Sequence, residues 1–62
     1  MSDRTETLKH LAKSGPVWDG NLISKTDRDE LVKAGLVDRS GGWNFLTRYG
    51  VEVAVQLGIL VP

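Results

Sequence analysis

The chain has 62 residues, and a domain of this size buries only about 60% of the surface that its unfolded form exposes, so we expect one domain over residues 1–62 and no deep cavity for a large cofactor. It contains no cysteine and one histidine, which excludes disulfides, thiolate metal sites and histidine clusters, and its apolar runs are far shorter than the roughly 18 residues of a membrane span. Eight basic residues offset eight acidic ones, whereas a dedicated nucleic-acid-binding domain usually carries a basic excess.

Residues 5–13 are predicted to form the first helix. Thr5 can accept hydrogen bonds from the free backbone N–H groups at the start of this helix. Gly15 can adopt the left-handed conformation that ends a helix, and Pro16 cannot continue it. The apolar residues of the helix, at spacings of three and four, are Leu8, Leu11 and Ala12.

The segment after this helix is short and irregular. Residues 16–18 are expected to be extended, as a short edge strand, because proline cannot continue the helix. Residues 19–23 can form one helical turn, with Leu22 and Ile23 facing inward.

A second helix with a clear start signal follows. Thr26 is one N-cap candidate, with Asp29 at the capping-box spacing, and Ser24 with Asp27 offers a second register two residues earlier. Gly35 ends this helix. The residues expected to face inward are Leu31, Val32 and Ala34.

A β-hairpin is predicted next. Its strands are residues 36–40 and 43–47, joined by Gly41 and Gly42. Two residues that tolerate positive φ suit the primed turns that match strand twist. Because an isolated two-stranded hairpin is marginal in water, it must pack against the helices.

The last predicted helix, residues 48–57 with Thr47 as its N-cap, is apolar over most of its surface. Its polar row, spaced by four, consists of Arg48, Glu52 and Gln56. An amphipathic helix on a small domain normally exposes about half of its circumference, which is more than this row covers. Two arrangements follow. Either Val53, Leu57 and Leu60 pack against a second chain, as a homodimer or with another protein, or the apolar tail folds back over the first helix.

The order of these elements is that of a winged helix-turn-helix domain. Three segments resemble winged-helix transcription regulators, in which L-V-x-x-G-L-V leads from the recognition helix into the wing and L-T-x-x-G leads from the wing into the next helix. They are residues 14–16 (SGP), 31–37 (LVKAGLV) and 45–50 (FLTRYG). Residues 19–25, with Arg28 and Asp29, are also similar to small phage-encoded proteins of this type. The resemblance covers residues 5–57 and implies a small α+β fold with three main helices and a two-stranded β-hairpin wing.

The sequence departs from the family between Pro16 and Gly35. Only eighteen residues lie there, too few for two full helices and their turn. The second helix of the family would therefore be reduced to about one turn. The minimal loop at Gly41 and Gly42 would also make the wing short.

The resemblance implies a DNA-binding regulator of transcription. Because the neutral chain lacks the basic excess that favours DNA, it would need charges segregated by face or the help of a second copy, so we expect a dimer. The helix that starts near residues 24–26 would enter the major groove, where the N-terminal residues of such a helix read bases. The candidate contacts to double-stranded DNA, from this helix and from the hairpin, are Ser24, Lys25, Thr26, Arg28, Lys33, Arg39 and Asn44. Against this reading, Asp27, Asp29 and Glu30 lie in the same turns and repel phosphate. A capped helix with solvated charges is therefore the alternative.

A protein-interaction adaptor is the alternative function on the same scaffold, because a fold does not dictate function. It would dock its partner through Trp18, Trp43 or the apolar C-terminal helix. Both indoles are expected to be core residues, and an indole that is partly exposed would act as an interface anchor.

No catalytic or metal-binding pattern stands out. His10 is the only histidine, and the acidic residues 27, 29 and 30 lack the glycine and terminal glutamate of a calcium loop. No glycine-rich phosphate loop is present. We therefore expect no enzyme, no metal and no cofactor. The first residues do not form a signal peptide, so we expect a cytoplasmic protein without a membrane partner.

Overall fold

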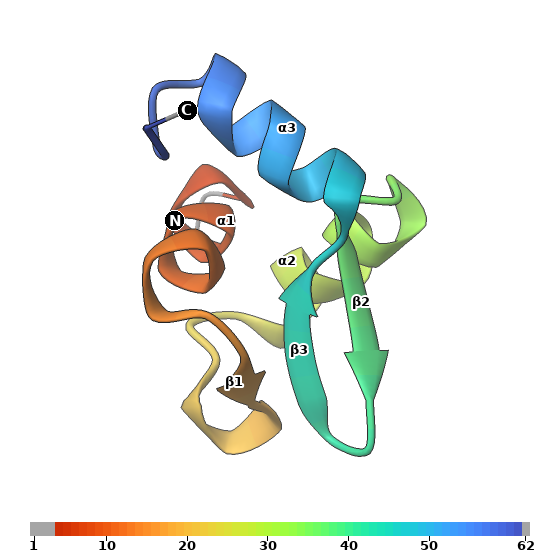
Figure 1. Cartoon of the computed structure of the whole chain (residues 1–62). Coiled ribbons are helices and arrows are strands. Elements are labelled where there is room, and N and C mark those ends of the chain that lie inside the picture. The colour runs from red at the N-terminus through yellow and green to blue at the C-terminus, as the bar shows by residue number, and fades with distance from the viewer. Residues whose placement is uncertain (1–3, 62) are drawn as a thin grey trace.

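The computed structural model of the chain describes residues 4–61 (Figure 1). Its elements, in chain order, are α1 (Arg4–Ser14), β1 (Val17–Trp18), the 3-10 turn η1 (Asp19–Asn21), α2 (Lys25–Lys33), β2 (Val37–Ser40), β3 (Trp43–Leu46) and α3 (Arg48–Gln56). The strands form an antiparallel sheet in the order β1-β3-β2. The predicted α+β class with three helices is confirmed, and the arrangement agrees with a small winged-helix-like fold.

The sheet has three strands, because the short edge strand expected at residues 16–18 is present as β1 and joins the predicted two-stranded hairpin. Residues 17 and 18 pair with β3, in the register Val17 with Asn44 and Trp18 with Trp43. The hairpin strands pair as expected, with Ser40 opposite Trp43 beside the two-glycine turn. The third strand therefore comes from a long-range pairing between the segment after α1 and the second arm of the hairpin.

The helix starts are set by side-chain caps. Ser24, rather than Thr26, caps α2, because its hydroxyl accepts a hydrogen bond from the backbone N–H of Asp27 at 3.2 Å. Thr47 caps α3 as predicted and accepts from the backbone N–H of Gly50 at 3.0 Å. The second of the two registers for α2 is therefore the one adopted.

The core lies between the sheet and the helices. Its buried residues are Leu8, Leu11, Val17, Leu31 and Val37, with Leu22, Leu36, Leu46, Val53 and Ile59 packed against them. Figure 1 shows the chain after α3 turning back toward α1, which agrees with the packing of Ile59 on the core. The apolar tail therefore folds back over the first helix, as one of the two arrangements predicts, while Leu57 stays exposed.

Three of the residues expected to face inward do not. Ile23 is 55% exposed and Val32 is 39% exposed, and Ala34 is also exposed. The short η1 turn lets residue 22 reach the core but leaves residue 23 outside it. On the nine-residue α2, Leu31 is the buried hydrophobic residue, so the inward stripe is narrower than predicted.

The start of α3 is packed tightly against the turn that follows α2. The backbone N–H of Thr47 donates to the carbonyl oxygen of Leu36 at 3.0 Å, and the Thr47 hydroxyl donates to the carbonyl oxygen of Gly35 at 2.6 Å. Gly50 faces the same turn, and a Cβ built on it would lie 1.9 Å from the Leu36 carbonyl oxygen. This close approach is possible only because residue 50 has no side chain.

Strand β2 forms one edge of the sheet. The backbone N–H of Arg39 on this strand donates to the Asp38 carboxylate at 2.8 Å. A local side chain thus satisfies this donor, which lies on an edge strand.

Within residues 4–61, none of the helices has the length and apolar character required to cross a membrane.

Candidate interaction surfaces

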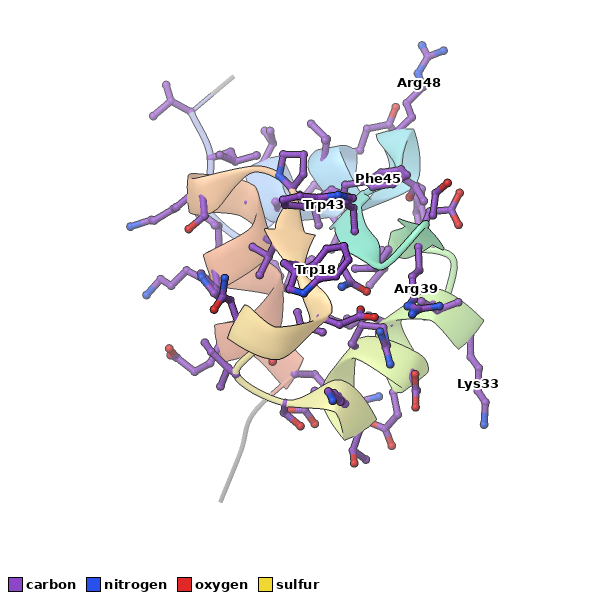
Figure 2. The ribbon with its side chains drawn as sticks, turned by 90° about the horizontal axis from the view of Figure 1, so that it is seen from below. Trp18, Lys33, Arg39, Trp43, Phe45 and Arg48 are labelled. Carbon is purple, nitrogen blue, oxygen red and sulfur yellow. The ribbon has the colours of Figure 1, made fainter. Side chains whose placement is uncertain are left out.

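Trp18 and Trp43 form an exposed aromatic pair on the sheet. Their neighbours Val17 and Asn44 are buried, and because side chains alternate along a strand, both indoles lie on the sheet face that points away from the core. The ring centroids are 5.2 Å apart with an interplanar angle of 66°, an edge-to-face contact (Figure 2). Trp18 is 46% and Trp43 is 49% exposed. The expectation that both indoles are core residues is therefore wrong.

Gly42 positions Trp18 in this pair. A Cβ built on Gly42 would lie 2.7 Å from two atoms of the Trp18 ring, so the indole rests directly on the glycine. The backbone N–H of Asp19 also donates to the Gly42 carbonyl oxygen at 2.9 Å, which joins β1 to the hairpin turn. The Trp18 ring and the Asp19 N–H thus both contact Gly42, which fixes the position of β1 relative to the hairpin turn.

We expect Gly42→Ala to disturb the aromatic pair, and Gly41→Ala to leave it intact. Both glycines have positive φ, so both substitutions cost backbone strain of roughly 1–2 kcal/mol. Only the methyl group at residue 42 meets Trp18, since nothing lies within 4 Å of a Cβ at residue 41. Near-ultraviolet circular dichroism of the tryptophans measures the difference. Equal spectra for the two variants would contradict the contact.

A shallow apolar pocket lies beside the aromatic pair. It has a volume of about 220 Å³ and is lined by residues of α1, the link between α1 and β1, β3, α3 and the C-terminal tail: Leu11, Ala12, Gly15, Pro16, Phe45, Leu46, Val51 and Leu60. Phe45 is two residues after Trp43 on β3, so both side chains share the outer face of the sheet. Phe45 therefore connects the pocket to the indoles. We call the surface formed by Trp18, Trp43, Phe45, Val51 and Leu60 the aromatic face.

A polar network holds the other side of the sheet against η1 and α2. The Asp19 carboxylate accepts hydrogen bonds from Arg28 Nη1 at 3.1 Å, Arg39 Nε at 3.1 Å and Asn44 Nδ2 at 2.7 Å. Asn44 Nδ2 also donates to the Val17 carbonyl oxygen at 3.1 Å, and Asn44 Oδ1 accepts from Arg28 Nη1 at 2.9 Å. These four side chains, from η1, α2, β2 and β3, are called the Asp19 network.

The Asp19 network favours the ionised carboxylate. Hydrogen bonds from Arg39 and then Asn44, with the positive charges of Arg39 and Arg28, hold the pKa of Asp19 well below its ordinary value. The same contact raises the pKa of Arg39. Asp19 is therefore ionised at neutral pH.

The stability of the fold should consequently fall in acid through Asp19. Because the pKa of Asp19 is lower in the folded than in the unfolded chain, its contribution is complete above the unfolded pKa of about 3.9 and is lost as the pH falls toward the folded value. In urea titrations at about pH 7, 5 and 3, the midpoint of the wild type should drop more between pH 5 and 3 than that of Asp19→Asn. Glu52→Gln, which removes an exposed carboxylate, should keep the wild-type acid sensitivity. Identical acid profiles for the wild type and Asp19→Asn would contradict this role.

Three of the residues predicted to contact DNA belong to this network. Asn44 is fully buried, so the expectation that this hairpin residue can contact DNA is wrong. The Arg28 side chain is only 12% exposed and is bonded to Asp19, Asn44 and Asp29. Arg39 is half exposed, with its guanidinium bonded to Asp19. Asn44 and Arg28 are therefore held inside the domain, and Arg39 is tied at its surface.

The remaining candidates for DNA contact lie on α2. Lys25, Thr26 and Lys33 are exposed, and Lys33 points away from the body of the domain in Figure 2. Ser24 is half-buried, and its hydroxyl serves as the helix cap. The acidic residues Asp29 and Glu30 are exposed on the same helix, which gives this surface both signs of charge.

The residues predicted for a protein interface are divided between the core and the surface. Val53 packs on the core, Leu60 lines the pocket, and Leu57 is 57% exposed. Phe45 and Val51 complete the aromatic face and were not predicted. The alternation from Trp43 to Phe45 is the sequence signal that places residue 45 beside the indoles.

Comparison of the chain with protein-family models, with curated proteins and with solved structures found no match. The winged-helix-like class therefore rests on the order of elements and on the β1-β3-β2 sheet.

Proposed function

We propose that this domain is a protein-interaction module, built on a small winged-helix-like scaffold, that binds its partner through the aromatic face. The observation that supports this most strongly is the contact between two half-exposed indoles on the outer face of the sheet. Tryptophan is among the residues most enriched at binding hot spots. Contiguous apolar surface on a small domain typically marks an interaction site.

The size and the lining of the pocket favour a macromolecular partner over a small molecule. Its volume of about 220 Å³ lies below the range of about 300–1,000 Å³ that is usual for small-molecule sites. Among residues 4–61, none of those that line it is charged. A single apolar side chain of a partner is therefore the occupant that suits it.

The Asp19 network supplies the rigidity that such a surface needs. It joins η1, α2, β2 and β3 directly behind the two strands that present the indoles. Rigid presentation of anchors lowers the entropy lost on binding.

Affinity capture tests this function. The wild type, Trp43→Ser and Tyr49→Ser are each immobilised and exposed to an extract of the cells that produce the protein. Tyr49 is a matched control, because it is 56% exposed and lies outside the aromatic face. A partner held by the wild type and by Tyr49→Ser, but lost with Trp43→Ser, is the expected result. Capture that is equal for all three proteins contradicts the proposal.

A second candidate is that α2 binds double-stranded DNA, as in a regulator of transcription. The observation in its favour is that Lys25, Thr26 and Lys33 are exposed on a helix whose place in the fold agrees with that of a winged-helix recognition helix. The acidic residues of the same helix and the neutral net charge argue for weak binding.

Salt-dependent binding to a labelled duplex tests this second candidate. Changing Lys25 and Lys33 together to alanine should reduce the slope of log affinity against log salt by about 2, since each lost phosphate contact contributes about 0.9. The control is Lys9→Ala with Lys13→Ala, the same change in charge on exposed positions of α1. Absence of binding by the wild type at low salt, or an equal loss in the control, rules the candidate out.

A further inference from the structure

We infer that the aromatic face pairs with a second copy of the chain, with Trp43 of each copy inserted in the apolar pocket of the other. This inference rests on the proposed function and names the occupant of the same surface. It makes the domain a symmetric dimer in which the sheet faces meet and α2, which lies behind the hairpin in Figure 1, stays outside the contact.

The aromatic face contains both a projection and a hollow. Trp43 is 49% exposed on β3, and the pocket begins at Phe45 on the same face of the same strand. A two-fold axis that passes between Trp43 and the pocket brings each indole opposite the hollow of the other copy. Such a contact is self-complementary and closed, so it ends at two chains.

The pocket and the Trp43 indole are both apolar, so they suit each other chemically. The pocket is lined by apolar side chains and glycine, and its volume of about 220 Å³ suits one inserted side chain. The indole of Trp43 is apolar on both faces, and its N–H lies at the ring edge, where it can stay at the rim of the contact. Trp18 packs edge-to-face against Trp43 and thus limits its rotamers before binding.

The charges also permit self-association. The formal net charge is zero, so two copies do not repel each other as two highly charged chains do. On α3, the helix that carries Val51, Arg48 Nε and Glu52 Oε1 lie 3.9 Å apart and both side chains are exposed, so this helix presents both signs of charge. A surface with both signs can face its own copy, whereas a surface of one sign cannot.

The area is sufficient for the centre of such an interface. A standard interface covers about 800 Å² on each partner, which is about a fifth of the 4085 Å² surface of the described chain. Two half-exposed indoles supply roughly 200 Å² of this, if a fully exposed indole buries about 200 Å². Phe45, Val51 and Leu60, which line the pocket, add to this area.

Sedimentation over rising protein concentration, up to about 1 mM, tests the pairing. The wild type and the control Tyr49→Ser are expected to form dimers. Trp43→Ser removes the inserted side chain, and Val51→Glu places a charge at the pocket, so both variants are expected to remain monomers at concentrations where the wild type is dimeric. Both positions are exposed by more than two fifths, so both variants keep the fold, as far-ultraviolet circular dichroism will verify.

Mixing the two monomeric variants is the decisive experiment. A pair of Trp43→Ser chains has no inserted indole, and a pair of Val51→Glu chains has no open pocket. A mixed pair has one intact contact, in which Trp43 of the Val51→Glu chain enters the pocket of the Trp43→Ser chain. We therefore expect isotope-labelled Trp43→Ser to show shift changes at its pocket residues when unlabelled Val51→Glu is added, and not when unlabelled Trp43→Ser is added.

Three results would overturn the inference: a wild type that is monomeric up to about 1 mM, a dimer that survives both substitutions, or a mixture that shows no association. The proposed function fails separately. A monomeric wild type that still captures another protein through Trp43 leaves the interaction module standing and rejects only the second copy as its partner.

Discussion

Gly50→Ala is expected to lower the free energy of unfolding by about 3 kcal/mol, although alanine is the better helix former by about 1 kcal/mol. The reason is the contact between α3 and the turn after α2. The added Cβ would lie 1.9 Å from the carbonyl oxygen of Leu36 and 2.9 Å from its carbonyl carbon. Both are backbone atoms, so no side chain can rotate away to make room.

Relief of this clash would require α3 to move, and the move has a further cost. The Leu36 carbonyl oxygen is also the acceptor of the Thr47 N–H at 3.0 Å, so separating the two segments breaks the hydrogen bond that joins them. The loss in stability should therefore combine strain with a lost contact.

Urea denaturation followed by circular dichroism measures this effect. Gly58→Ala is the control, because it adds the same methyl group where nothing lies within 4 Å. Its positive φ of 76° predicts a cost of roughly 1–2 kcal/mol from the backbone alone. A Gly50→Ala protein as stable as the wild type would show that α3 does not approach residue 36 this closely.

Asn44→Leu is the second substitution with a large expected effect, again about 3 kcal/mol. Leucine has nearly the same shape as asparagine but offers neither a donor nor an acceptor. Asp19 and the Val17 carbonyl oxygen would each lose a hydrogen bond donor, and Arg28 would lose an acceptor. Because Asn44 is fully buried, water cannot replace these partners without opening the sheet.

The matched control for Asn44→Leu is Asn21→Leu. Asn21 is exposed at the end of η1, and surface substitutions of this kind usually change stability by less than about 0.5 kcal/mol. Equal denaturation midpoints for the two variants would mean that the Asp19 network does not stabilise the fold.

Local signals in the sequence were sufficient to predict the order of the elements. The cap at Thr47 and the two-glycine turn each act on neighbouring residues, so each can be read from a few letters. The sequence offered two N-cap candidates for α2, Ser24 and Thr26. In the structure Ser24 is the cap, and Asp27, whose backbone N–H donates to it, is buried. Sequence alone could not distinguish the two.

The edge strand at residues 17 and 18 was predicted, but its pairing with β3 and the Asp19 network could not be predicted in this way, because their partners are distant in the chain. Val17 pairs with Asn44, 27 residues later, and the propensity of a two-residue segment does not reveal such a partner. Arg28 resembles a surface residue near the start of a helix, yet its acceptors come from η1 and β3.

The sequence does not show which face of the sheet is exposed, for a related reason. In residues 43–46 (WNFL) three of four side chains are apolar, so alternation does not show which face is buried. The pairing with β1 determines which face is buried. It turns Asn44 toward the core and leaves Trp43 and Phe45 on the outer face of the sheet. The pattern therefore predicts a core position for Trp43, whereas the structure leaves it 49% exposed.

The bond between Asp38 and the N–H of Arg39 on strand β2 has a consequence for solubility at high concentration. A neutral protein lacks the mutual repulsion that keeps many proteins dispersed, so open sheet edges are where fibril growth would start. Here the donor that an incoming strand would need is already taken by a carboxylate, which would also be desolvated by any strand laid against it. The Asp38 carboxylate thus opposes the addition of a strand at this position of the β2 edge, while the indoles on the outer face of the sheet remain exposed.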